Sequence, residues 1–197
     1  MTKLLELAER MDDLKEISIE YSAKGTFSIA MPKDMDDRFS RVHIALTANK
    51  ANDKATLATV DLVRIPSDLG KMGIRITNYD TEEAMKNSTI SELSAIAHAL
   101  HIGEYHDFAD ETQPIDVFDA MIFSDLYYIE NFCVENGYRG YGIGSALIDA
   151  LPSIIKFYCG GEDVFFATFT DDMKLARFYQ KHGFKSFGNG VYAKQID

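Results

Sequence analysis

The sequence predicts a mixed α/β domain, and three observations lead to that prediction. In the first half, several segments alternate apolar and polar residues or run apolar with β-branched residues, which is typical of strands. After Ser124, a strand pattern, a glycine-rich loop, a helical pattern and a second strand pattern follow one another, as in a parallel crossover unit. The 197 residues are 46% hydrophobic, enough for one core. We therefore expect a single domain over residues 1–197.

The first half is predicted to be rich in strands. A short N-terminal helix, with its apolar residues at helical spacing, precedes them. The three clearest strand patterns cover residues 16–23, 41–49 and 55–65, and residues 72–80 form a weaker fourth candidate.

A helix and an acidic connection are predicted before residue 124. Thr89 followed by Glu92 has the spacing of a capping box, and it opens a helical pattern over residues 90–101. The apolar residues of that helix share one face: Leu93, Ile96, Ala97 and Leu100. Residues 103–119 then contain six carboxylates and no Lys or Arg. That stretch is predicted to be a solvated connection or a lid.

The second half is predicted to alternate strands with helices. The predicted order is a strand over 126–134, a helix over 146–159, a strand over 163–170, a helix over 171–183 and a hairpin centred on Asn189-Gly190. Pro152 lies inside the first of these helices, where it removes a backbone donor and clashes with the preceding turn. We therefore expect a kink near residues 149–152.

Composition and charge exclude several classes of protein. Twenty basic and 31 acidic residues give a formal net charge of −11, which opposes binding to nucleic acid and to anionic membranes. No segment approaches the roughly 18 consecutive apolar residues of a membrane span, and no signal peptide is evident. Cys133 and Cys159 are too few for a disulfide framework or a four-ligand metal site. We expect a soluble cytoplasmic protein with no bound metal.

The loop "RGYGIG" between a predicted strand and a predicted helix points to an anion. A helix N-terminus presents backbone N–H groups and the positive end of the helix dipole. Glycines let an anion approach the backbone, and Arg139 adds a permanent charge. No Lys follows the glycines before Lys156, which excludes a Walker P-loop, and G-x-G-x-G is not the Rossmann spacing. A phosphate or pyrophosphate site is favoured over a tight turn that needs glycine for its geometry alone.

Two motifs give the chain a resemblance to a known family. Arg139-Gly140-Tyr141-Gly142-Ile143-Gly144 resembles the coenzyme A signature of the GNAT acyltransferase superfamily, and "LARFYQKHGFK" is similar to its second motif. The resemblance covers about residues 126–184. It implies the GNAT fold: a mixed, mostly antiparallel sheet with splayed parallel fourth and fifth strands and flanking helices. Residues 65–124 would then be a helical insertion before the fourth strand.

The same resemblance implies a set of residues that bind acetyl-CoA. In the family the pantetheine arm lies beside the fourth strand and the pyrophosphate lies on the loop. An Asn that contacts the cofactor is common at the position where this chain has Asp172, which weakens a cofactor role there and suits a helix cap instead. The implied residues are Phe132, Cys133, Val134, Arg139, Gly140, Tyr141, Gly142, Ile143, Gly144, Ser145 and Asp172.

The resemblance also implies two catalytic residues. Tyr179 matches the tyrosine that protonates the leaving thiolate in the family; the alternative is an aromatic residue of the core. Glu130 matches a glutamate that acts as a base, often through water, or anchors the acceptor amine. The alternative for Glu130 is a structural ion pair, since a carboxylate within a strand is costly when it is buried without a partner.

The implied activity is transfer of an acetyl group from acetyl-CoA to a primary amine by direct attack in a ternary complex. A small cationic amine such as a polyamine or an aminoglycoside suits the acidic charge. Acetylation of a protein N-terminus or a lysine is the first alternative. A non-catalytic module that binds acyl-CoA is the second, and a homodimer through the insertion is compatible with either. No nucleic-acid or membrane partner is expected.

Overall fold

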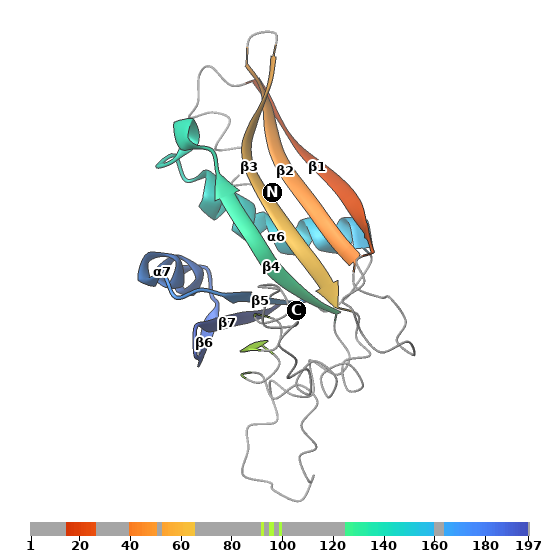
Figure 1. Ribbon diagram of the computed structural model, residues 1–197. Helices are drawn as coiled ribbons and strands as arrows, with labels where there is room; N and C mark the ends of the chain where they lie inside the picture. Colours follow the sequence, from red (N-terminus) through yellow and green to blue (C-terminus); the bar gives the residue numbers. More distant parts are fainter. Residues whose placement is uncertain are drawn as a thin grey trace, which may run out of the picture.

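The computed structural model describes residues 15–26, 40–50, 53–65, 125–159 and 164–196, together with Glu92, Ala95, Ile96 and Ala99. The described strands form one seven-stranded sheet in the order β1-β2-β3-β4-β5-β7-β6 (Figure 1). The strands are β1 (Lys15–Thr26), β2 (Ser40–Lys50), β3 (Asp53–Ile65), β4 (Asp125–Val134), β5 (Val164–Phe169), β6 (Lys185–Gly188) and β7 (Val191–Ile196). The helices are α6 (Ile143–Cys159), α7 (Met173–Lys181) and the short 3-10 helix η1 (Asn136–Tyr138).

The sheet is antiparallel except at one pair of strands. Strands β4 and β5 are parallel, and α6 lies between them in the chain as the crossover connection. All other neighbouring strands pair antiparallel. The predicted mixed α/β class and the mostly antiparallel sheet with parallel fourth and fifth described strands are therefore confirmed.

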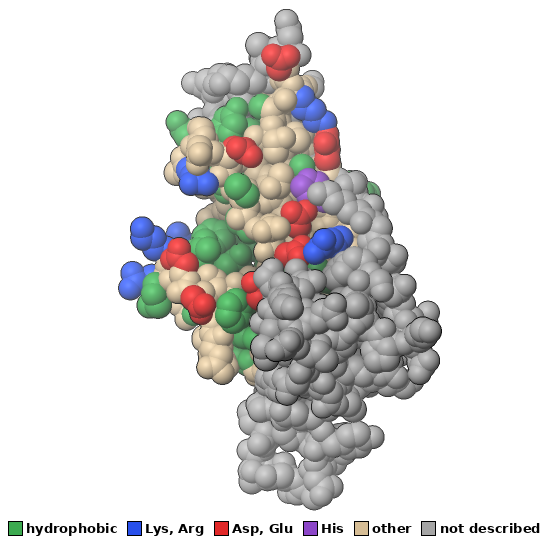
Figure 2. Space-filling model, viewed as in Figure 1, with side chains coloured by type: hydrophobic (Ala, Val, Ile, Leu, Met, Phe, Trp, Pro, Cys, Tyr) green, Lys and Arg blue, Asp and Glu red, His purple; other side chains and the backbone are tan. Residues whose placement is uncertain are grey.

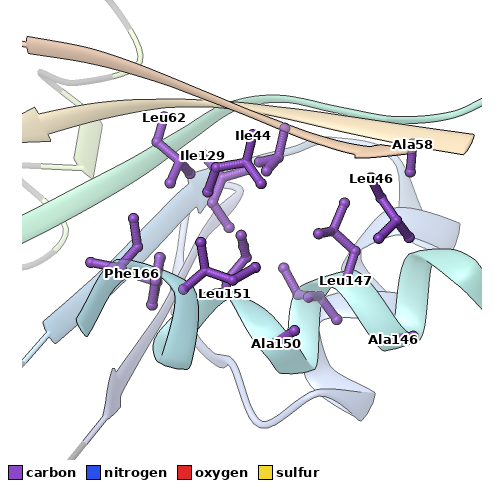
Figure 3. Close-up of a cluster of buried hydrophobic side chains, with 14 of the residues drawn as sticks. Ile44, Leu46, Ala58, Leu62, Ile129, Ala146, Leu147, Ala150, Leu151 and Phe166 are labelled. Carbon is purple, nitrogen blue, oxygen red and sulfur yellow. The ribbon is translucent and has the colours of Figure 1, made fainter. Parts of the chain in front are cut away.

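The core lies between α6 and one face of the sheet. Ala146, Leu147, Ala150 and Leu151 recur every three or four residues along α6, so their side chains share one face of the helix. All four belong to one buried cluster, and Figure 3 shows Leu147 and Leu151 directed at residues of β2, β3 and β4. The strand residues that they meet include Ile44, Leu46, Ala58, Leu62 and Ile129.

The periodicity of the sequence predicted the seven described strands, α6 and α7 correctly, with ends shifted by a few residues, but it did not predict the short helix η1. In the predicted helix over 90–101, all four described residues are helical, and Ile96 is buried as expected. The N-terminal helix, the candidate strand over 72–80 and the acidic connection lie outside the described residues. Residues 65–124, predicted to be an insertion, lie almost entirely outside the described residues, so the insertion stays a prediction.

Pro152 does not interrupt α6. The helix continues on both sides of it, from Ile143 to Cys159. Proline has no N–H to donate to the carbonyl of Ile148, so this turn of the helix lacks one hydrogen bond. Packing of the apolar face against the sheet holds the helix together at that point. The kink predicted near residues 149–152 stays a prediction.

The C-terminal hairpin forms where Asn189-Gly190 predicted it. Asn189 has φ +47° and Gly190 has φ +79°, the pair of positive values that a two-residue turn between twisted antiparallel strands requires. This hairpin places β7 between β5 and β6.

A bulge in β4 changes the direction of the strand. Leu62 of β3 is opposite Ile129, and the preceding Asp61 is opposite Asn131, so Glu130 is the additional residue. Pairing of β4 with β5 ends one residue before the bulge, at Ile129 and Thr168. Strand β4 then continues along β3 to Val134, and the two parallel strands diverge in Figure 1.

Among the described helices, none is long and apolar enough to cross a membrane.

The packing of α6 predicts a large difference between two identical substitutions. Leu147→Ala in α6, at 0% exposure, should lower the free energy of unfolding by about 2–5 kcal/mol, because it removes apolar contacts and leaves a cavity. Leu175→Ala in α7, at 45% exposure, should cost less than about 1 kcal/mol. Urea unfolding measures both values. Equal costs would contradict the assignment of this face of α6 to the core.

Candidate functional site

Two glycines give the loop before α6 its shape. Gly140 has φ +86° and Gly142 has φ +83°, a left-handed conformation that other residues adopt only with strain. A Cβ added at either position would meet no other atom within 4 Å. These glycines are therefore required for backbone conformation, and open space lies beside them. As far as the described residues go, a ligand can approach the backbone there without meeting a side chain.

The third glycine has a different role. A Cβ at Gly144 would lie 3.2 Å from Cγ2 of Val134 and 3.4 Å from Cε1 of Phe132. Such contacts are tighter than ordinary van der Waals contact, so a side chain here would push α6 away from β4. Gly144 therefore allows the first turn of α6 to pack closely against the end of β4.

Backbone N–H groups at the start of α6 are available to a ligand. The first helical hydrogen bond runs from the N–H of Ala146 to the carbonyl of Gly142, at 2.9 Å. The N–H groups that precede it in the helix have no partner within the helix, and the helix dipole is positive at this end. Ile143 contributes its backbone only, because its side chain is buried in the core.

Arg139 braces the loop. Its Nε donates to the carbonyl oxygen of Val134, at 2.9 Å, and thus ties the loop to the last residue of β4. The residue is exposed. Of the two roles that were open for Arg139, bracing is present, and contact with an anion stays a prediction.

The end of β4 presents an alternation of exposed and half-buried residues. Phe132 and Val134 pack against the core cluster, and the ring of Phe132 lies 5.7 Å from that of Phe178 in α7. Cys133 between them is exposed. This stretch lies beyond the pairing with β5, next to the loop, so the structure brings these three predicted residues together with the glycines.

Tyr179 is buried where β4 and β5 diverge. It is 4% exposed, on α7, with its ring close to those of Phe178 and Phe184. Burial raises the pKa of Tyr179 above its ordinary value of 10.0, and a hydrogen bond with the side chain of Thr168 opposes that rise. The hydroxyl is therefore protonated at neutral pH and can donate a proton. Thr168 also donates to the carbonyl of Ile129 at 3.3 Å, at the last paired position of the parallel strands.

Glu130 forms an ion pair. Its Oε1 lies 2.6 Å from an Nη2 of Arg41 in β2, and its side chain is 14% exposed. The ion pair that was the alternative for Glu130 is therefore present. Arg41 and Glu130 lie on the face of the sheet opposite α6, since Val42 and Ile129, their neighbours along the strands, face the helix.

A second carboxylate lies near Glu130. Tyr128 donates its hydroxyl to the carboxylate of Glu92. Burial raises the pKa of Glu92 above its ordinary value of 4.5, and the negative charge of Glu130 raises it further. Two acidic side chains close enough to influence each other make this part of the sheet attractive to a cation.

Asp172 caps α7. Its Oδ1 accepts a hydrogen bond from the N–H of Lys174 at 2.7 Å, the usual N-cap contact. The carboxylate thus has the capping role that the sequence suggested as the reason for its departure from the family pattern.

Several residues of this region were missed in the sequence. His182, at the end of α7, lies 2.7 Å from Asp149 and 3.1 Å from Ser145, both in α6. Arg41 pairs with Glu130 across 89 residues of sequence. The four-residue spacing of Ser145 and Asp149 showed that they share a helix face, but nothing indicated His182 as their partner.

Among the described residues, no group of three His, Cys, Asp or Glu side chains could hold a metal.

Comparison with known proteins places this region in a family. Residues 103–186 match the family model described as acetyltransferase (GNAT) domain. The matched range contains both the glycine loop and Tyr179. A search of curated proteins finds no match.

Solved structures of similar chains share low sequence identity with this one. An apo mutant of agmatine N-acetyltransferase is 14% identical, covers 77% of this chain and 76% of its own, and has a TM-score of 0.47. AtaTR bound with AcCoA is 11% identical, covers 94% and 95%, and scores 0.46. Arabidopsis thaliana NAA60 with a bisubstrate analogue is 15% identical, covers 80% and 77%, and scores 0.40. With all three scores below 0.5, the resemblance of residues 103–186 to the family rests on the domain match.

The loop geometry predicts that two glycines differ in their tolerance of alanine. Gly142→Ala should lower the free energy of unfolding by about 1–2 kcal/mol, because alanine is strained at φ +83° although space is open. Gly137→Ala, in η1, also meets nothing within 4 Å and has no positive φ, so its effect should be close to zero. Chemical denaturation compares the two. Equal stability of the variants would contradict the left-handed conformation of the loop.

Proposed function

We propose, on the premise of the acetyltransferase (GNAT) domain match over residues 103–186, that the chain transfers an acetyl group from acetyl-CoA to a small cationic primary amine. The observation that carries the proposal is the loop between β4 and α6. Its left-handed glycines border open space, beside the part of β4 that extends beyond β5. An acyltransferase domain with such a loop has a place for a diphosphate and, next to it, a strand for the rest of the donor.

Exposed charges of the loop and of α7 fit an anionic donor. The chain as a whole is strongly acidic, yet Arg139 in the loop and Lys174, Arg177 and Lys181 on α7 are all exposed. The three α7 residues follow one another at spacings of three and four, so they share a face of the helix. Figure 2 shows Lys and Arg side chains projecting at the α7 edge of the molecule. These cations attract the phosphates of coenzyme A, although the net negative charge of the whole chain repels them.

The residues that would hold the donor are those that the structure gathers at the end of β4 and the start of α6. Backbone groups of Phe132, Cys133 and Val134 would align the pantetheine arm, while the amides from Gly140 to Ser145 would receive the diphosphate. The carbonyl of Val134 already accepts a hydrogen bond from Arg139. A hydrogen bond to the pantetheine arm would therefore share this carbonyl with Arg139. Tyr141, which is exposed, would flank the donor, and Asp172 enters only as the cap of α7.

Acetyl-CoA supplies the thioester carbonyl carbon that the amine attacks and the sulfur that leaves. Tyr179 would donate its hydroxyl proton to that sulfur, since burial keeps the phenol protonated at neutral pH. The hydrogen bond between Tyr179 and Thr168 opposes the rise in the pKa of Tyr179, so it eases loss of the proton. Both residues lie where β4 and β5 separate, which is where the reacting atoms would be held.

Glu130 would receive the proton of the acceptor amine or hold its ammonium group. An amine must lose a proton before it attacks, and its reference pKa of about 10.4 makes a base useful at neutral pH. Glu92 is close enough to influence Glu130, so the pair presents negative charge to a cation. This pair supports a small cationic acceptor. Binding of an ammonium group here would offset the repulsion that raises the pKa of Glu92.

Measurement of thiol release tests the proposal. Purified protein with acetyl-CoA is offered diamines, polyamines, aminoglycosides, lysine and peptides with free N-termini, and released coenzyme A is titrated. Turnover with the small cationic amines is expected. Turnover with peptides alone would favour the protein acetyltransferase, and binding of acetyl-CoA without turnover on any amine would favour the non-catalytic module.

Tyr179→Phe should lower kcat by about 10²-fold or more while leaving the Kd for acetyl-CoA nearly unchanged, because only the proton donor is lost. Steady-state kinetics and a binding titration give the two values. Phe178→Leu, next to it on α7, serves as a control for packing near the donor. Full activity of Tyr179→Phe would contradict the assignment of Tyr179 as the acid.

Two substitutions separate catalysis by Glu130 from its ion pair. Glu130→Gln should lower kcat/KM for the amine by about 10²-fold, since the base or anchor is lost. Arg41→Gln breaks the same ion pair but keeps the carboxylate, so it should retain most of the activity. Kinetics together with thermal unfolding of both variants measures the difference. Equal losses of activity, accompanied by equal losses of stability, would leave Glu130 with a structural role only.

A further inference from the structure

Three side chains form a hydrogen-bonded chain between the two helices of the proposed donor site. His182 Nδ1 lies 2.7 Å from Oδ1 of Asp149, and His182 Nε2 lies 3.1 Å from Oγ of Ser145. The histidine side chain is 7% exposed, and that of Asp149 is 24% exposed. Ser145 is the third residue of α6, immediately after the loop glycines. The proposed function uses the backbone of Ser145 but neither of the other two residues.

The imidazole is held in place from several directions. Its ring lies 4.8 Å from that of Phe178, centre to centre. The backbone N–H of His182 donates to the carbonyl of Tyr179, and its carbonyl accepts from Nζ of Lys194 at 2.8 Å. Because Ser145 and Asp149 are one turn apart on α6, both can reach the same ring. The ring therefore cannot turn away from Ser145 without losing these contacts.

The number of protons on the imidazole of His182 decides what the hydroxyl of Ser145 can do. An ionised carboxylate only accepts, so Nδ1 of His182 donates to Asp149. In the neutral ring Nε2 is then an acceptor, and the hydroxyl of Ser145 donates its hydrogen to that nitrogen. In the protonated ring Nε2 donates to Oγ, and the hydrogen of the hydroxyl is released for another acceptor. Protonation of His182 thus converts Ser145 from an acceptor into a donor towards the loop.

We propose that His182, held by Asp149, is a positioning residue that takes up a proton when the donor binds and so turns the Ser145 hydroxyl into a donor to the diphosphate. The inference rests on the proposed function, since it needs a diphosphate on the loop. The oxygens of a diphosphate are acceptors, so a serine that can only accept would repel them. Histidine is the side chain that ordinarily changes charge between about pH 5 and 8.

Among the described residues, the charges that face His182 from the elements packed around it are those of Asp149 and Lys194. Asp149, on α6, contacts the ring directly. Lys194, on β7, contacts the backbone carbonyl. Phe178 on its own helix and Ser145 on α6 are uncharged. A bound diphosphate adds negative charge on the Ser145 side, and this addition would draw in the proton.

Calorimetric titration with coenzyme A tests the proposal. The heat of binding is measured at several pH values between 7 and 8.5, at each of them in buffers of different ionisation enthalpy, and the slope at each pH gives the number of protons taken up. The wild-type protein should take up a fraction of a proton, which is largest where the free imidazole is neutral and the imidazole of the complex is still protonated. Its affinity should correspondingly fall by up to about tenfold per pH unit across this range.

Two variants identify the group that takes up the proton. His182→Gln places an amide that donates to Ser145 at every pH, so it should bind coenzyme A with a pH-independent affinity and without proton uptake from this residue. Ser145→Ala should bind about tenfold more weakly, since it loses a hydrogen bond to a charged group. It should also show reduced uptake. Any proton that coenzyme A itself exchanges is common to all the proteins and cancels in the comparison.

The outcomes separate the inference from the proposed function. No binding of coenzyme A by the folded wild-type protein would overturn the proposed function itself. Binding with the same proton uptake in wild type and His182→Gln would overturn this inference while the donor site stands. Asp149→Asn keeps the shape and loses the charge, so it should weaken binding most at the higher pH values. Thermal unfolding of each variant checks that it is folded.

Discussion

Backbone pairing between β4 and β5 ends at Ile129 and Thr168, and the candidate site is arranged around that point. The additional residue at Glu130 turns β4 along β3 while β5 leads away towards α7. One parallel pair therefore produces two diverging strands, because a bulge alters the direction of only the strand that contains it. Tyr179 and Thr168 occupy the point of divergence, and the glycine loop lies at the far end of β4. The proposed donor site uses this geometry: the reactive end of acetyl-CoA would lie near the divergence and its anionic end at the loop.

The loop glycines meet two separate physical requirements of the proposed donor site. Gly140 and Gly142 give the backbone a left-handed shape with open space beside it, while Gly144 lets α6 approach β4. The close approach brings the start of α6 near Phe178 and His182 of α7, so one helix N-terminus is joined to the other helix by side chains. The proposed proton uptake by His182 depends on this packing. An anion bound at the loop would act on α7 through Ser145 rather than through the backbone.

The fold and the candidate site differ in how far the sequence predicted them. Strands and helices depend on local periodicity, and the pattern over residues 126–134 or the apolar face of α6 is readable within a dozen residues. The loop and Tyr179 were predicted through motifs that are also local. The contacts of the site are not local: Arg41 meets Glu130 across 89 residues, and His182 meets Asp149 across 33. The bulge at Glu130 is a matter of register between β3 and β4, which no property of either strand alone specifies.

The most direct test of the account is the thermal unfolding of the protein with and without saturating acetyl-CoA. A ligand at about 100 times its Kd stabilises the folded state by ~2.7 kcal/mol. For a chain of 197 residues, a Tm increase of roughly 5–11 °C is predicted. An unchanged Tm with acetyl-CoA, coenzyme A and longer acyl-CoAs would contradict the donor site. The glycine loop would then be required only for the turn between β4 and α6.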